Sequence, residues 1–182
     1  MFVWARLSRT PLQVLGFTAL RRWSTTIAGG AIFGIALKLG LKIIVMPLLG
    51  APDTNIPYHY LVGNTKALPA IIAFVVLSGG FAEEVFYRGY LFERFGALLG
   101  SSKQALAAAI VFSTALFAAA HYSDQGLAGV QQAVITGLVF GGLFAWRRQL
   151  WLVMIVHAAF DLTAIALIYW DLERAAAHLL LP

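Results

Sequence analysis

The chain has 182 residues, of which 60% are hydrophobic and only 12% are charged. A compact soluble domain of this length cannot bury so many apolar side chains, so most of them must face lipid. The composition therefore excludes a water-soluble domain and a disordered chain. It predicts an all-α, polytopic membrane protein, because no segment shows the alternating polarity of a membrane-spanning β-strand.

The net charge of +5 is unevenly distributed along the chain. Residues 1–52 hold six Lys and Arg and no acid, whereas residues 53–182 hold seven Lys and Arg against eight Asp and Glu. This pattern is typical of an orientation signal or of attraction to anionic lipid, so we expect the lipid bilayer as a partner and no nucleic acid. The absence of cysteine excludes disulfides, thiolate nucleophiles and cysteine metal sites.

Residues 1–25 mix four arginines with Phe, Trp and Leu, which predicts a basic amphipathic segment lying as a helix in the membrane interface. A mitochondrial-type presequence is the alternative. We expect residues 26–182 to form a single transmembrane helical domain, with the residues that carry chemistry between positions 67 and 170.

The transmembrane domain contains long apolar stretches separated by Gly, Pro, Ser and Asp. A spanning helix needs ~20 mostly apolar residues. About five stretches qualify, the second of them continuing past an acidic pair into residues 81–99. They are residues 27–50, 67–82, 104–123, 125–146 and 149–170.

The cations also predict the orientation. If residues 1–25 are cytoplasmic, the turns at 100–103 and 147–148 lie on the same side, and only Lys66 and Arg174 lie opposite. We therefore expect an integral, multi-pass protein with a cytoplasmic N-terminus. The lack of cysteine, the many alanines and the small size favour a prokaryotic plasma membrane.

Three groups of ionisable residues lie within the apolar stretches, where each costs at least ~2.5–3.5 kcal/mol. In the first, Glu84 and Arg88 are four residues apart and can pair along one helix face, which leaves Glu83 without a partner on its own helix. An unpaired carboxylate that reaches water is a candidate general base. The alternative is that both glutamates and Arg88 form a buried ionic staple between helices.

The other two groups contain histidines. His121 follows Phe117 by four residues near the end of the third stretch, where a histidine alone would more often be a cap or an interface residue. His157 and Asp161 share one face of the fifth stretch, where a hydrogen bond that only holds helices together is the alternative.

The helical rise predicts whether these groups can meet. Glu83 and His121 both lie ~25–27 Å from the turn at residues 100–103, whereas His157 lies only ~12 Å from the turn at 147–148. The three groups lie at the same depth in the bilayer only if the helix over residues 81–99 projects beyond the membrane. We then expect a site inside the bilayer that opens toward the cytoplasm.

The three groups together resemble the motifs of the CAAX protease and bacteriocin-processing family (CPBP, or Abi) of intramembrane endopeptidases. The family pattern is E-E-x-x-x-R, then F-x-x-x-H, then H-x-x-x-N or D. Here it is matched in order by Glu83-Glu84 with Arg88, Phe117 with His121, and His157 with Asp161. The resemblance covers roughly residues 67–170.

The resemblance implies hydrolysis of a peptide bond in a peptide or protein that reaches the site through the membrane, by CAAX-type or leader-peptide-type processing. It implies that Glu83 and His121 activate a water, that His157 and Asp161 bind the oxyanion, and that Glu84 and Arg88 position the others. Asp161 departs from the asparagine of other members, because an ionised aspartate cannot donate a hydrogen bond. Its expected role is to hold the tautomer of His157.

A metal-dependent version of this protease is the first alternative. Two histidines and two carboxylates, namely Glu83, His121, His157 and Asp161, could bind Zn²⁺ with one position open for water. We favour hydrolysis without a cofactor, because no H-E-x-x-H helix supplies two histidines together and the motifs resemble glutamate-type members.

Two non-protease alternatives remain. The intramembrane carboxylates and histidines could form the proton relay of a small proton-coupled transporter, although no paired repeat accompanies them. The chain could also be a non-catalytic scaffold or immunity protein of the same fold. The sequence does not indicate the substrate or the oligomeric state.

Overall fold

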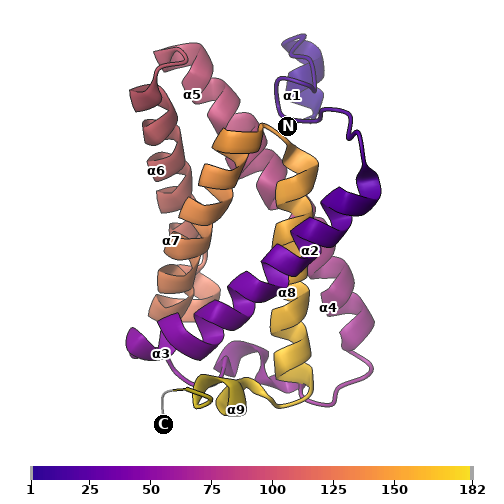
Figure 1. Cartoon of the computed structure of the whole chain (residues 1–182), viewed down its shortest axis with the longest axis vertical. Helices are drawn as coiled ribbons and strands as arrows, with labels where there is room; N and C mark the ends of the chain where they lie inside the picture. Colours follow the sequence, from indigo (N-terminus) through magenta and orange to yellow (C-terminus); the bar gives the residue numbers. More distant parts are fainter. Residues whose placement is uncertain (1, 181–182) are drawn as a thin grey trace.

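The computed structural model describes residues 2–180, which fold into a bundle of helices without a strand (Figure 1). Several helices follow one another without a break. In chain order the elements are α1 (Phe2–Leu7), α2 (Trp23–Gly40), η1 (Leu41–Val45), α3 (Met46–Leu48), η2 (Ile56–Leu61), α4 (Leu68–Phe74), η3 (Val75–Glu83), η4 (Val85–Tyr90), α5 (Leu91–Leu99), α6 (Lys103–Ala120), α7 (Tyr122–Arg147), α8 (Leu150–Tyr169) and α9 (Glu173–Ala177).

Five helical runs are long and apolar enough to cross a membrane, as the sequence predicts. They are Trp23–Leu48, Leu68–Leu99, Lys103–Ala120, Tyr122–Arg147 and Leu150–Tyr169. The second run has 32 residues and is ~48 Å long, more than the ~30 Å of a hydrocarbon core. It must therefore tilt or project from the bilayer. The all-α, multi-pass membrane fold is confirmed.

Helix α8 lies at the centre of the bundle and packs against α2 and η3. Its buried face joins aromatic residues of α7 in the main core, which includes Phe140, Phe144, Val153 and Val156. Large apolar side chains elsewhere point outward, such as Leu77, which is 65% exposed. An apolar surface of this kind fits contact with lipid.

The helix expected over residues 1–25 is much shorter than predicted. Between residues 2 and 22 only Phe2–Leu7 is helical, because Pro11 cannot donate a backbone hydrogen bond and Gly16 adopts a φ of 97°, and α2 begins only at Trp23. The segment after α1 instead packs onto the bundle: Leu15 is buried, and the Leu150 amide donates to the Gly16 carbonyl at 2.9 Å.

The long second run contains the wide π-helical turns of η3 and η4. Such turns are rare and occur frequently at functional sites. Two glycines let η3 approach α8 closely. A Cβ at Gly79 would lie 2.6 Å from Oδ2 of Asp161, and one at Gly80 would lie 2.9 Å from Cβ of Ala158. The first motif is thereby brought against the third.

The two ends of the bundle differ in the segments that they contain. Helix α1 and the turns between α5 and α6 and between α7 and α8 form one end, at the top of Figure 1. The other end contains α3, η2 and α9, and we call it the η2 end.

Candidate active site

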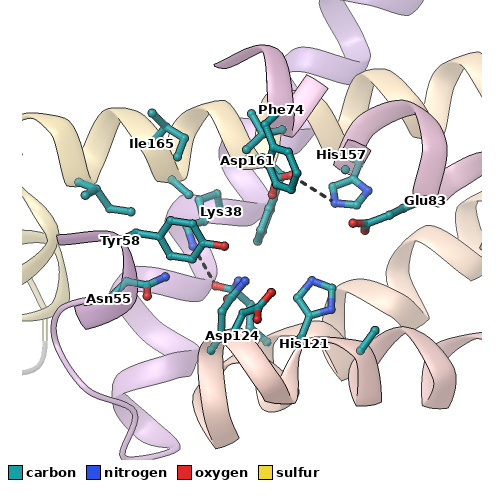
Figure 2. Close-up of a pocket in the computed structure, with 18 of the residues that line it drawn as sticks. Lys38, Asn55, Tyr58, Phe74, Glu83, His121, Asp124, His157, Asp161 and Ile165 are labelled. Carbon is teal, nitrogen blue, oxygen red and sulfur yellow. Dashed lines mark hydrogen bonds and ion pairs between the residues drawn. The ribbon is translucent and has the colours of Figure 1, made fainter. Parts of the chain in front are cut away.

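Four of the six predicted site residues line one cavity of about 180 Å³. Glu83 comes from η3, His121 from the α6–α7 junction, and His157 and Asp161 from α8. Figure 2 shows Glu83, His121 and His157 gathered around one part of this cavity. The three motifs therefore meet in space, as their order along the chain predicts.

The cavity extends to the η2 end of the bundle. Its lining there includes Asn55 and Tyr58 around η2, and Asp124 and Gln125 at the start of α7. This end is opposite to the one that contains α1. The expectation that the site opens toward the side of the N-terminus is therefore wrong, because the rise along single helices does not reveal which loops border the cavity.

Glu83 faces the cavity and forms no ion pair with any of residues 2–180. Its Oε2 atom is buried and has no hydrogen-bond partner among residues 2–180. The neighbouring Glu84 points instead into the protein, where it is fully buried. The two carboxylates thus have different environments, and only Glu83 is placed to meet a molecule in the cavity.

Glu84 holds two residues of the site together. Its Oε1 atom accepts a hydrogen bond from Nη1 of Arg88 at 2.7 Å and lies 2.6 Å from Nδ1 of His157. The ion pair with Arg88 is the one that the i,i+4 spacing predicts. The alternative of an ionic staple between helices formed by both glutamates and Arg88 differs from this arrangement, because Glu84 pairs with Arg88 on its own helical run and Glu83 takes no part.

Arg88 is fully buried, and its surroundings compensate its charge without contact to the cavity. Besides the pair with Glu84, its Nη2 atom donates to the Gly137 carbonyl at 3.4 Å. The guanidinium also lies 4.7 Å from the ring centroid of Phe117 and 5.4 Å from that of Phe140. Cation–π contacts of this kind favour the charged guanidinium. Arg88 is therefore placed to position Glu84 and does not reach a substrate.

His121 is oriented by its own helix. Its Nδ1 atom lies 2.8 Å from the carbonyl oxygen of Phe117, and its ring centroid lies 4.5 Å from that of Phe117. A carbonyl oxygen only accepts, so Nδ1 carries the hydrogen. In the neutral imidazole Nε2 is then an acceptor.

His157 lies between two carboxylates. Nδ1 contacts Glu84, as described above, and Nε2 lies 3.5 Å from Oδ2 of Asp161. The sequence predicted that Asp161 holds the His157 tautomer. The shorter contact is with Glu84 from another helix, which fixes the hydrogen on Nδ1 because a carboxylate accepts it. Asp161 stands instead beside the nitrogen that faces the cavity.

Sequence reasoning missed several polar residues of the cavity, among them Lys38 on α2 and Tyr58 in η2. A lysine inside an apolar stretch is a signal in itself, but nothing in the sequence connected Lys38 with the three motifs. Tyr58 lies in a connecting segment. Burial and the nearby Asp124 carboxylate raise the pKa of its phenol, so Tyr58 remains a hydrogen-bond donor.

The four residues proposed as alternative metal ligands do not form a metal-binding group. Across residues 2–180, no three His, Asp or Glu side chains are arranged to hold an ion. His121 directs Nδ1 to a carbonyl and His157 directs Nδ1 to Glu84, a pattern that also occurs around metal-ligating histidines.

Comparisons with known proteins give one family. Residues 65–163 match the family model described as "Type II CAAX prenyl endopeptidase Rce1-like". No curated protein and no solved structure matches the chain. The matched range covers more than half of the chain and contains all three motifs that line or support the cavity. The chain therefore belongs to the Rce1-like type II CAAX prenyl endopeptidases of the CPBP family, which are intramembrane proteases.

Proposed function

We propose that the protein hydrolyses a peptide bond of a membrane-delivered peptide, with Glu83 as the general base. The observation that carries the proposal is that Glu83, His121 and His157, from three different elements, face one cavity. Glu83 has a carboxylate oxygen without a partner among the described residues, which suits it to receive a proton.

In the proposed mechanism, a water binds between Glu83 and His121. Glu83 takes a proton from this water while the water oxygen attacks the scissile carbonyl carbon, and Nε2 of His121 accepts the second hydrogen bond of the water and orients it. The carbonyl oxygen becomes an oxyanion. When the carbon–nitrogen bond breaks, Glu83 returns the proton to the leaving amine.

His157 stabilises the oxyanion in this proposal. With Nδ1 held by Glu84, its Nε2 atom faces the cavity beside Asp161. An imidazolium donates from both nitrogens, so Nε2 can donate to the oxyanion while Nδ1 donates to Glu84. Arg88 and Glu84 act through His157 and are positioning residues. This scheme uses no metal ion.

The test is cleavage of a quenched peptide library with free C-termini by the purified protein in liposomes. Wild type should cleave members of the library, and Glu83→Gln should not. Glu93→Gln is a matched control, because Glu93 pairs with Arg94 further along the same helical run and lies outside the cavity. Wild-type rates in Glu83→Gln would contradict the mechanism. Absence of any cleavage by wild type would favour the non-catalytic scaffold.

We further infer that the end of the bundle that contains α1 is cytoplasmic. That end carries most cations of the loops, namely Arg6, Arg9, Arg21, Arg22, Lys103, Arg147 and Arg148. The η2 end carries Lys66 and Arg174 together with Asp53, Asp124, Asp171 and Glu173. By the positive-inside rule, the η2 end, to which the cavity extends, then faces away from the cytoplasm. The substrate would reach the site from that side or from within the bilayer.

This orientation can be measured because the chain has no cysteine of its own. Ser123 and Ser101 are exposed serines near the η2 end and at the opposite end, respectively. In intact cells an impermeant maleimide should label Ser123→Cys, and should label Ser101→Cys only after permeabilisation. The reverse pattern would overturn the orientation and leave the proposed chemistry unaffected.

A further inference from the structure

The residues before α2 form a basic segment that the catalytic scheme does not use. We call residues 2–22 the arginine segment, because they contain four arginines and no acid. The segment lies at the end of the bundle that contains α1 (Figure 1). It precedes residues 65–163, the range that matches the family. The three motifs therefore assign it no role.

The arginine side chains of this segment point away from the protein and have no acidic partner. All four are exposed, namely Arg6, Arg9, Arg21 and Arg22. No carboxylate among residues 2–180 lies within 4.0 Å of any of them. Arg6 and Arg9 line a concavity of about 330 Å³ together with Thr10 and the apolar Phe2 and Leu12. Because a guanidinium matches the geometry of a phosphate, this surface is suited to a phosphate group.

The apolar side chains beside the arginines indicate that the phosphate belongs to a lipid. Val3 and Leu7, on the same helix as Arg6, are 72% and 79% exposed. Trp23 begins α2 and Trp146 lies next to the last residue of α7, and both tryptophans are exposed. Exposed tryptophans at the ends of spanning helices are typical of the membrane–water interface. Arginines beside apolar side chains at this depth are suited to an anionic phospholipid, whereas a free phosphate would not account for the apolar side chains.

The inner side of the arginine segment packs against the helical run Leu68–Leu99, which carries the first motif. Phe2 and Phe17 contact Phe81, just before the general base, with ring centroids 6.2 and 6.4 Å apart. Trp4 contacts Tyr90, just after the arginine of the first motif, with ring centroids 4.9 Å apart. The segment therefore holds this run on both sides of the motif.

The same segment also holds the start of α8. The Leu150 amide donates to the Gly16 carbonyl at 2.9 Å, and Nε2 of Gln149 donates to Oγ1 of Thr18 at 2.8 Å. Helix α8 carries the histidine that stabilises the oxyanion in the proposed mechanism. The arginine segment thus connects the run that carries the general base with the helix that carries the oxyanion site.

We propose that the arginine segment binds anionic phospholipid and that this binding accelerates the proposed hydrolysis by keeping the Leu68–Leu99 run and α8 together. The effect on the rate rests on the proposed function, whereas lipid binding does not depend on it. In a neutral membrane the clustered arginines have no counter-charge and repel one another. The segment then separates from the bundle more readily, and the catalytic groups are held less precisely.

Lipid binding is measured with an environment-sensitive fluorophore on Leu7→Cys, an exposed position in a chain without another cysteine. The protein is placed in phosphatidylcholine vesicles with and without phosphatidylglycerol. Phosphatidylglycerol should shift the emission to shorter wavelength, because α1 moves into a less polar environment. Adding Arg6→Gln and Arg9→Gln should remove most of the shift. Equal emission in the two kinds of vesicle would overturn the inference, whatever the protein cleaves.

The effect on catalysis is measured as the cleavage rate of one library peptide without net charge in the same vesicles. Wild type should be faster with phosphatidylglycerol by about fivefold, which corresponds to the contribution of one arginine at an anionic surface. Arg6→Gln/Arg9→Gln should lose most of this difference and keep the wild-type rate in phosphatidylcholine alone. The matched control is Lys103→Gln/Arg147→Gln, which removes two exposed cations from the same end of the bundle but outside the segment. It should respond to phosphatidylglycerol as wild type does.

The outcomes separate this inference from the proposed function. A wild-type rate that does not respond to phosphatidylglycerol would overturn the inference and leave the proposed function intact. Equal losses of response in the two double variants would also overturn it, because the general charge of this end would then be the cause. If wild type cleaves no peptide in either kind of vesicle, the proposed function fails and the effect on the rate fails with it, while the emission shift still decides whether the segment binds anionic lipid.

Discussion

Glu84 contacts His157 at 2.6 Å across 73 positions of sequence and so connects the first motif to the third. The same oxygen accepts the hydrogen bond from Arg88. Glu84 therefore has a different role from Glu83. It orients an imidazole and neutralises a buried guanidinium, while Glu83 faces the cavity.

Glu84→Gln tests this positioning role. The substitution leaves the buried Arg88 charge uncompensated, so we expect the free energy of unfolding to fall by about 3–5 kcal/mol. We also expect cleavage to fall by about 10²–10⁴-fold, since the His157 imidazolium that stabilises the oxyanion loses the negative charge beside Nδ1. Thermal unfolding and cleavage rates in detergent measure both effects. Glu93→Gln, in a more exposed pair, should change stability by less than about 1 kcal/mol.

Asp161→Asn should retain activity within about tenfold of wild type, or raise it. The reason is that Glu84 already fixes the hydrogen on Nδ1 of His157, and an asparagine amide can donate to an oxyanion as a carboxylate cannot. Asp161→Ala, which can neither accept from Nε2 of His157 nor donate to an oxyanion, is the companion variant and should be less active than Asp161→Asn. A loss of several orders of magnitude in Asp161→Asn would show that Asp161 controls the tautomer after all.

Gly79→Ala should reduce cleavage strongly without unfolding the protein. The new Cβ would lie 2.6 Å from Oδ2 of Asp161 and 3.7 Å from Nε2 of His157, so the Asp161 side chain must move. Gly96→Ala is the matched control in the same helical run, because its Cβ would meet no atom within 4 Å. It should keep full activity and gain up to about 1 kcal/mol in stability. Normal cleavage by Gly79→Ala would mean that the position of Asp161 does not matter.

Lys42→Met should destabilise the fold through Glu173, which would be left as an unpaired buried carboxylate. We expect a loss of about 3–5 kcal/mol in the free energy of unfolding. The double variant Lys42→Met/Glu173→Gln should recover most of it. Unfolding of both variants by denaturant in detergent provides the comparison, and equal losses in the two would show that the ion pair is not the cause.

The sequence predicted the spans and the meeting of the motifs, because long apolar stretches and fixed spacings such as Glu84 with Arg88 are local properties. Contacts between helices could not be predicted in this way. The bond between Glu84 and His157 depends on how η3 packs against α8, and that packing depends on Gly79 and Gly80.

The same limit applies to Lys38 and to the N-terminal segment. Lys38 reaches the cavity only because α2 packs against α8. The amphipathic composition of residues 1–25 predicts a surface helix, but Pro11 and Gly16 end helical structure early and Leu15 is buried against the bundle. Composition indicates that a segment prefers the membrane interface. Its helix-breaking residues and its packing contacts determine the conformation that it adopts there.

The most direct test of the central claim is the cleavage rate of one library peptide, measured for wild type and Glu83→Gln with and without a strong chelator. We predict equal rates for wild type in both conditions and no cleavage by Glu83→Gln in either. Cleavage by Glu83→Gln at the wild-type rate would contradict Glu83 as the general base. Loss of wild-type activity with the chelator, restored by added Zn²⁺, would contradict a metal-independent reaction.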